Sequence, residues 1–171
     1  MKYLKLILLF ALSSVFTCAH GADEVPVVMV NFVGAWTLHA FSFQKEDGSV
    51  IYPFGENPEG IAIYDATGHM SAQIMRAGIP KFHSGERTGE PTDVETRTAY
   101  EGFIGYGGTY GADPYKKTVV FHVKVSSYPN WVSTELKRSF EFATNRLTLR
   151  AKIPSMEGIP ATLVQVWDRV E

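Results

Sequence analysis

Residues 135–142 read Glu135-Leu136-Lys137-Arg138-Ser139-Phe140-Glu141-Phe142, and they alternate between polar and mostly apolar side chains. A period of two places successive side chains on opposite faces of a β-strand. Leu136, Phe140 and Phe142 then share one face. Arg138 shares it too, although a charge on an apolar face is costly to bury without a partner. This pattern predicts a strand over residues 134–142, with one face in a core and one cation on that face.

Several other short segments are typical of strands. Residues 147–153 repeat the alternation, with leucine, alanine and isoleucine opposite threonine, arginine and lysine. Further segments rich in strand formers are 36–43, 50–52, 60–65, 69–76, 118–125 and 162–170. Turn signals such as Asp47-Gly48 separate them. Eight or nine short strands in one chain indicate a β-sandwich or a β-barrel.

Length and composition favour one globular domain and exclude several classes of protein. The chain has 171 residues, 45% of them hydrophobic and 20% charged. A formal net charge of -2 gives no reason to expect nucleic-acid binding. The single cysteine excludes an intrachain disulfide framework and a cysteine-rich zinc site. The chain has no glycine-rich phosphate loop, dinucleotide fingerprint or Gly-x-Ser-x-Gly elbow, and we expect no cofactor.

The first 21 residues have the pattern of a secretory signal peptide. Lys2 and Lys5 precede an apolar run over residues 6–12, and small residues stand at Ala19 and Gly21. We therefore expect export to the periplasm or the medium, with cleavage after Gly21. The alternatives are a membrane anchor, for which the run is short, and a lipoprotein site at Cys18, which lacks small residues before it.

Cleavage would change the charge balance of the chain. The mature protein would keep 14 basic residues against 18 acidic ones, and it would contain no cysteine. Thiol catalysis and disulfide bonds would then be excluded. We expect residues 22–31 to form a loose lead-in and residues 32–171 to form one domain, with no stable membrane insertion.

One segment predicts a helix. Thr92 and Glu95 have the spacing of a capping box, and Val94, Tyr100 and residues 103–104 could share a helical stripe. We expect a helix over residues 92–104, lying over one face or the mouth of the barrel. Before it, the loop over residues 77–91 is either a functional lid or an ordinary surface loop without a functional role.

Several motifs together resemble the bacterial and fungal lipocalin-like domain family, of the calycin type. They are Gly34-Ala35-Trp36, Tyr52-Pro53-Phe54-Gly55, Gly68-His69-Met70-Ser71-Ala72-Gln73, Gly107-Gly108-Thr109-Tyr110, Pro129-Asn130-Trp131-Val132 and Val166-Trp167-Asp168-Arg169-Val170. The resemblance covers residues 32–170. It implies an all-β fold: a single antiparallel barrel of eight to ten strands, with an interior cavity and one helix packed on it. It does not imply one activity, because such folds host both carriers and enzymes.

The resemblance also implies a structural role for Trp36. In this fold the tryptophan sits at the closed end of the barrel and packs against an arginine from near the end of the chain. Arg169 is the positional match, and Arg138 is a second candidate.

Arg138 is the foremost candidate for ligand binding. Its guanidinium suits a carboxylate, because a planar fork of donors can contact both oxygens. Alternatively, it is a buried arginine stacked on an aromatic ring or paired with an acid.

Further candidates for the cavity lining carry hydrogen-bonding or aromatic groups. They are Gln73, His122, Tyr64, Tyr110 and Trp131. Either face of the strand over residues 69–76 could turn inward. Simple alternation sends His122 outward unless a bulge reverses it, and the aromatic residues could merely fill the core. No histidine pair has metal-ligand spacing, so we expect no metal site.

These features predict an exported lipocalin-like protein that binds a small hydrophobic, fatty-acid-like and anionic ligand in its cavity, as a monomer or weak oligomer. One alternative is an isomerase or cyclase acting on an apolar substrate. That enzyme needs converging polar groups, such as His122 with Arg138 or Tyr110. The other alternative is a module whose outer surface binds a protein.

Overall fold

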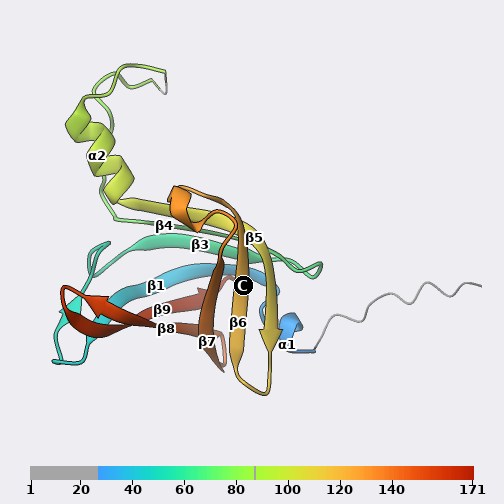
Figure 1. Cartoon of the computed structure of the whole chain (residues 1–171). Coiled ribbons are helices and arrows are strands. Elements are labelled where there is room, and N and C mark those ends of the chain that lie inside the picture. The colour runs from blue at the N-terminus through green and yellow to red at the C-terminus, as the bar shows by residue number, and fades with distance from the viewer. Residues whose placement is uncertain (1–26, 87) are drawn as a thin grey trace, which may run out of the picture.

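Antiparallel strands form a closed barrel in the computed structural model, which describes residues 27–86 and 88–171 (Figure 1). The strands are β1 (Gly34–Lys45), β2 (Val50–Ile51), β3 (Glu59–Tyr64), β4 (His69–Met75), β5 (Phe103–Asp113), β6 (Thr118–Ser126), β7 (Glu135–Ala143), β8 (Arg146–Met156) and β9 (Ile159–Arg169). The helices are α1 (Val27–Val30), α2 (Asp93–Glu101) and the 3-10 turn η1 (Pro129–Trp131). The predicted signal peptide lies outside the described residues.

The long first strand closes the barrel. Its first residues pair with β3, and from Trp36 onward it also pairs with β9, with a bulge between Leu38 and Ala40. Every other neighbouring pair is antiparallel and consecutive from β3 to β9. β2 adds only two residues beside the end of β1. Eight strands therefore form the closed wall, which confirms the expected all-β lipocalin-like barrel.

An aromatic cluster fills one end of the barrel, which we call the closed end. Phe32, fully buried just before β1, lies at its centre. Its ring centroid is 4.9 Å from that of Phe142 and 5.1 Å from that of Phe140. The segment expected to be a loose lead-in, residues 22–31, contains the helical turn α1, and Phe32, the first residue of the expected domain, packs inside the barrel.

Trp36 and Arg169 pack together at this closed end. The ring of Trp36 is fully buried, and its Nε1 donates a hydrogen bond to the Phe32 carbonyl oxygen at 2.8 Å. The Arg169 guanidinium lies over the ring, with Cζ 4.2 Å from the centroid. Arg169, not Arg138, therefore takes the place that the resemblance implied beside Trp36.

The glycine of the Gly34-Ala35-Trp36 motif has a physical explanation. Gly34 has a φ of +128°, and a Cβ there would lie 2.9 Å from Nη1 of Arg169. Glycine accepts this backbone conformation, and it leaves room for the arginine.

The strand β5 corrects the sequence expectation that the helix continues to residue 104. The helix ends at Glu101, and Phe103 already belongs to β5, which contains four glycines. Glycine is depleted in strands, so the sequence pattern did not indicate one here. The glycines permit close approach: a Cβ on Gly108 would overlap the His122 carbonyl oxygen, beside a bulge in the β5–β6 ladder.

The helix α2 meets the barrel only through its last turn (Figure 1). The expected capping box is present: the Glu95 N–H donates to Thr92 Oγ1 at 3.2 Å, and the Thr92 N–H donates to the Glu95 carboxylate at 2.8 Å. No residue of α2 is buried, and Val94 is 74% exposed. The expected helical stripe therefore does not form, and the helix stands at the open end of the barrel.

Candidate functional site

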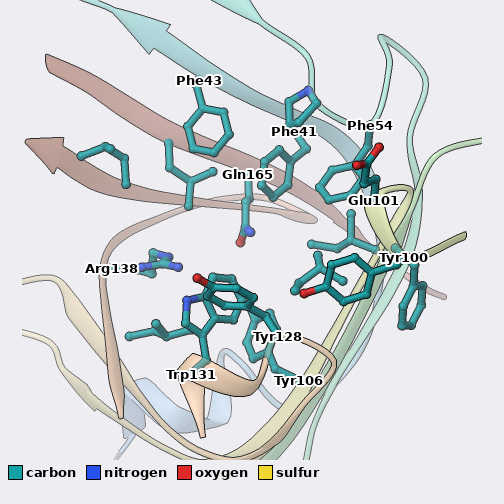
Figure 2. A pocket seen from close by; sticks show the side chains of 17 residues that line it. Phe41, Phe43, Phe54, Tyr100, Glu101, Tyr106, Tyr128, Trp131, Arg138 and Gln165 are labelled. Carbon is teal, nitrogen blue, oxygen red and sulfur yellow. The ribbon is translucent and has the colours of Figure 1, made fainter. Parts of the chain in front are cut away.

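A cavity of about 470 Å³ opens at the end of the barrel opposite Trp36 (Figure 2). Strand ends, the last turn of α2 and the turn η1 surround it. Most lining side chains are apolar or aromatic: Phe41, Phe43, Pro53, Phe54, Ile74, Tyr100, Phe103, Ile104, Tyr106, Tyr128, Trp131, Leu136, Ile153 and Leu163. A largely apolar cavity of this size suits a small organic molecule.

Two buried polar side chains project into the cavity from β7 and β9, the two strands that pair with β8. Arg138 on β7 is 8% exposed, and Gln165 on β9 is 2% exposed (Figure 2). Arg138 Nη1 donates a hydrogen bond to the carbonyl oxygen of Lys137 at 3.1 Å. Among residues 27–86 and 88–171, neither Arg138 Nε nor Gln165 Oε1 has a hydrogen-bond partner. Buried polar groups are normally satisfied, so both atoms are available to a bound molecule or to water.

Arg138 lacks the partners that a purely structural role would supply. No carboxylate within residues 27–86 and 88–171 lies within 4.0 Å of its guanidinium nitrogens. Burial lowers the pKa of Arg138, and the nearby Tyr106 and Tyr64 oppose this shift. An arginine remains protonated in proteins. Within the described part of the chain, the cavity therefore contains a buried cation that has no ion-paired carboxylate and lies near the phenol of Tyr106.

One side of the cavity is formed by packed aromatic rings. Trp131 lies in η1, which begins at Pro129, a residue suited to the first position of a helix. The ring of Trp131 packs edge to face with Tyr106 at 5.6 Å and with Tyr128 at 5.7 Å. Burial raises the pKa of Tyr106, so its phenol stays neutral near pH 7. The arrangement presents aromatic faces and edges to a ligand beside Arg138.

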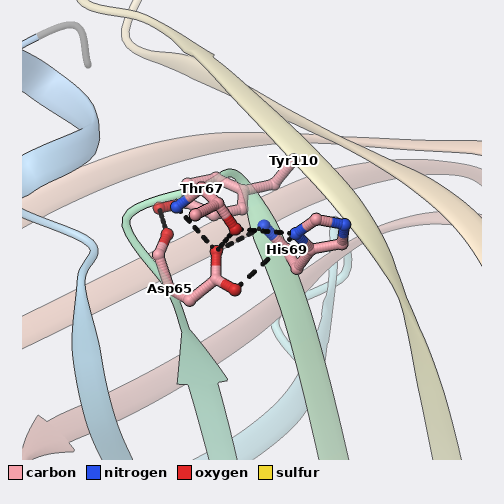
Figure 3. Close-up of polar contacts among 4 residues, drawn as sticks. All are labelled: Asp65, Thr67, His69 and Tyr110. Atoms are coloured by element: carbon pink, nitrogen blue, oxygen red, sulfur yellow. Dashed lines mark hydrogen bonds and ion pairs between the residues drawn. The ribbon is translucent and has the colours of Figure 1, made fainter. Parts of the chain in front are cut away.

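The structure places Tyr64 and Tyr110 in the closed-end core, not in the cavity lining. Their rings are 5.1 Å apart and both contact Phe32. The Tyr110 hydroxyl donates a hydrogen bond to the Asp65 carbonyl oxygen at 3.0 Å (Figure 3). The two tyrosines therefore fill space beneath the cavity, and we correct the expectation that they line it.

Gln73 and His122 lie on the outer face of the barrel, which corrects their predicted place in the cavity. Gln73 is exposed and its Nε2 donates to Ser71 Oγ at 2.6 Å, because β4 turns its other face inward. His122 is also exposed, and its Nδ1 lies 3.1 Å from the carboxylate of Glu135. The bulge in the β5–β6 ladder lies at residues 107–108 and does not turn His122 inward.

His69 belongs to the hydrogen-bonded turn between β3 and β4. The Asp65 carboxylate accepts hydrogen bonds from the backbone N–H groups of Thr67 and His69, each at 2.8 Å (Figure 3). The His69 ring is exposed, with Nδ1 2.9 Å from the Thr67 hydroxyl oxygen. These contacts close the hairpin at the closed end of the barrel, away from the cavity.

The side chains named for an enzymatic reaction do not converge. Arg138 lies in the cavity, Tyr110 in the core, and His122 on the outside. Within the described part of the chain, no group of three or more His, Cys, Asp or Glu side chains could hold a metal ion. No helix among the described residues is long and apolar enough to cross a membrane.

Sequence reasoning missed two polar groups of the cavity. Gln165 lies two residues from both Leu163 and Trp167, so the three side chains share one face of the strand. The same period of two that placed Arg138 on an apolar face would have identified Gln165. Glu101 also lines the mouth, from the last turn of α2. Nothing in the sequence indicated its position, because no residue of α2 is buried and the helix meets the barrel only at its end.

Comparison with known proteins agrees with this architecture. The family model of the lipocalin-like domain matches residues 33–170. A protein of Aspergillus oryzae named as a 4'-hydroxy-3'-methoxypropiophenone carrier protein is 31% identical over 108 residues, which cover 59% of this chain and 96% of that protein. The closed antiparallel barrel and the match over nearly the whole described domain lead to one conclusion: the chain belongs to the lipocalin-like domain family.

Proposed function

We propose that the protein is a carrier that binds a small, mostly apolar molecule in the barrel cavity. The observation that supports this most is the composition of the lining: an almost continuous apolar and aromatic wall with a few polar groups, two of them deeply buried. Such a cavity binds chiefly by removing apolar surface from water, while a few polar groups orient the ligand. The similarity to a protein named as a carrier supports the same reading.

The polar end of the ligand is proposed to lie at Arg138, and Gln165 offers a second polar contact inside the cavity. The guanidinium provides N–H donors, and the Gln165 amide can donate through its nitrogen and accept through Oε1. A fatty-acid-like carboxylate would gain a charge-assisted hydrogen bond from Arg138. An aromatic ketone, the kind of compound in the name of the A. oryzae protein, would offer a carbonyl acceptor and a ring that can pack against Trp131.

Export is a separate part of the proposal. It is supported by Lys2 and Lys5, the apolar run that follows them, and the small residues at Ala19 and Gly21. N-terminal sequencing of protein recovered from the periplasm or medium of its own source should begin at Ala22. Recovery of the protein only from the cytoplasm, with Met1 retained, would contradict export.

Binding in the cavity can be tested with Nile red, a neutral dye whose fluorescence rises in apolar surroundings. Leu136 lines the cavity and is only partly buried, so Leu136→Trp adds bulk on the side that faces the cavity. Val120 lies on the outer face of β6, and Val120→Trp provides a control with the same added ring. We expect saturable binding to the wild type and to Val120→Trp, and weak binding to Leu136→Trp. Equal binding to all three would contradict the proposal.

A further inference from the structure

The ladder between β7 and β8 covers only part of the two strands. Cross-strand pairs join these strands only from Ser139 with Arg150 to Ala143 with Arg146. Residues 135–138 of β7 pair with β6 instead, and residues 151–153 of β8 pair with β9. Figure 1 shows β7 leaving β8 at a steep angle. At the level of Arg138 the two strands are therefore not joined by a ladder.

A space of about 590 Å³ lies where the two strands are not joined, and we call it the lateral slot. Its lining is Thr118, Lys137, Arg138, Ser139, Arg150, Ala151, Lys152, Ile153 and Thr162. Most of these side chains belong to the outer face of the barrel. Arg138 and Ile153 belong to the inner face and line the ligand cavity as well. Arg138 and Ile153 therefore lie between the lateral slot and the apolar cavity, and each residue lines both spaces.

The lateral slot is strongly basic in a chain with a net negative charge. Four of its nine lining residues are lysine or arginine, and none is acidic. Arg150 is paired with the Glu141 carboxylate at 3.2 Å. No carboxylate among residues 27–86 and 88–171 lies within 4.0 Å of Lys137, Arg138 or Lys152. These three cations can therefore act on an anion in the slot without competition from an ion-paired protein carboxylate.

We infer that the ligand is an amphiphile with one anionic head group, whose apolar part lies in the cavity and whose head group lies in the lateral slot. This inference rests on the proposed function and names the ligand class for that site. Arg138 would contact the head group from the cavity side, while Lys137 and Lys152 approach it from outside. A head group in the slot keeps part of its hydration, which reduces the cost of burying an ion.

The proposal predicts a dependence on head-group charge. Decyl phosphate and decanoate carry different anionic heads on similar apolar chains, and decanol carries a neutral one. Calorimetric titration of all three, below their aggregation concentrations, would compare the wild type with Lys137→Ser/Lys152→Ser. The control is Lys116→Ser/Lys124→Ser, which removes the same charge from exposed positions outside the slot.

We expect the slot variant to bind at least one of the two anions about three- to thirtyfold more weakly, since each exposed pairing contributes up to about 1 kcal/mol. Its binding of decanol should match the wild type, as should all binding by the control variant. High salt should reduce the difference between wild type and slot variant. Weaker binding of both anions, or of only one of them, by the slot variant supports a head group in the lateral slot. The anion that is affected identifies the head group that the slot accepts.

Two results would overturn the inference, and they can be told apart. If the slot variant binds both anions as tightly as the wild type, while decanol and Nile red bind normally, the head group does not lie in the slot and the carrier proposal stands. The inference also fails if anions and decanol weaken alike in the slot variant. If none of these compounds binds the wild type, the proposed function itself is wrong.

Discussion

Arg169 lies over Trp36, with Cζ 4.2 Å from the ring centroid, and the two residues also face each other in the β1–β9 ladder. The guanidinium donates further hydrogen bonds to the carbonyl oxygens of Val33 at 2.7 Å and Asn31 at 2.6 Å. One side chain from the end of the last strand thus binds the segment before the first strand. Because the pairing of β1 with β9 closes the barrel, this contact stabilises that pairing at the closed end.

Removal of the Trp36 ring should destabilise the barrel strongly. The side chain is fully buried, and Trp36→Ala would leave a large cavity and remove the contact with Arg169. We expect the free energy of unfolding to fall by about 3–5 kcal/mol. Urea denaturation followed by circular dichroism measures this change. An unchanged transition midpoint would contradict the assigned packing.

Gly34→Ala should destabilise the protein more than Gly158→Ala. Both glycines have a positive φ, so both substitutions strain the backbone by about 1–3 kcal/mol. Only at Gly34 would the new Cβ also lie 2.9 Å from Arg169, whereas the space around Gly158 is empty. Thermal unfolding of the two variants compares the costs. Equal melting temperatures would show that the close approach to Arg169 has no energetic consequence.

Stability should decline in alkaline solution. Burial raises the pKa of Tyr110 to about 12, and burial also raises those of Tyr64 and Tyr106. In the unfolded chain these phenols ionise near pH 10. Between pH 10 and 12 the unfolded chain therefore releases protons that the folded protein retains, and stability falls as the pH rises.

Tyr110→Phe should remove part of this alkaline decline. Chemical denaturation at several pH values between 9 and 12 provides the measurement, and Tyr115→Phe is the control because Tyr115 is 98% exposed. A decline of the same slope in wild type and Tyr110→Phe would contradict the assignment.

Gln165→Leu should separate stability from ligand selectivity. Oε1 of Gln165 is buried and has no hydrogen-bond partner in the part of the chain that the structure describes, which costs about 1–3 kcal/mol. An apolar replacement of similar size should therefore leave stability unchanged or raise it. The same variant should bind polar-ended ligands more weakly, with little effect on Nile red. A clear loss of stability would show that the amide is satisfied within the protein.

The sequence was most informative where one face of a strand differed sharply from the other. In β7 the alternation of charged and apolar side chains identified the inner face correctly, including Arg138. In β4 both faces carry uncharged residues of moderate size, and the pattern could not decide whether Gln73 points inward. The structure resolves this, since Met70, Ala72 and Ile74 are buried.

Features that depend on contacts distant in sequence could not be predicted. Gly108 of β5 lies close to the backbone of β6, and a local pattern contains no information about that neighbour. The lateral slot lies where the ladder between β7 and β8 ends, which could not be predicted although both strands were recognised. The assignment of Tyr64 and Tyr110 to the cavity failed because aromatic residues serve equally well in a core.

The most direct test of the account is the effect of Arg138→Met on the binding of decanoate and decanol. The substitution keeps most of the apolar side chain and removes the charge. A hydrogen bond to a charged group contributes about 1.5–3 kcal/mol, so decanoate should bind roughly ten- to a hundredfold more weakly, with decanol much less affected. Melting curves of both proteins control for stability. If acid and alcohol binding change alike while the variant loses stability, Arg138 is structural; if neither compound binds the wild type, the cavity does not carry a ligand of this class.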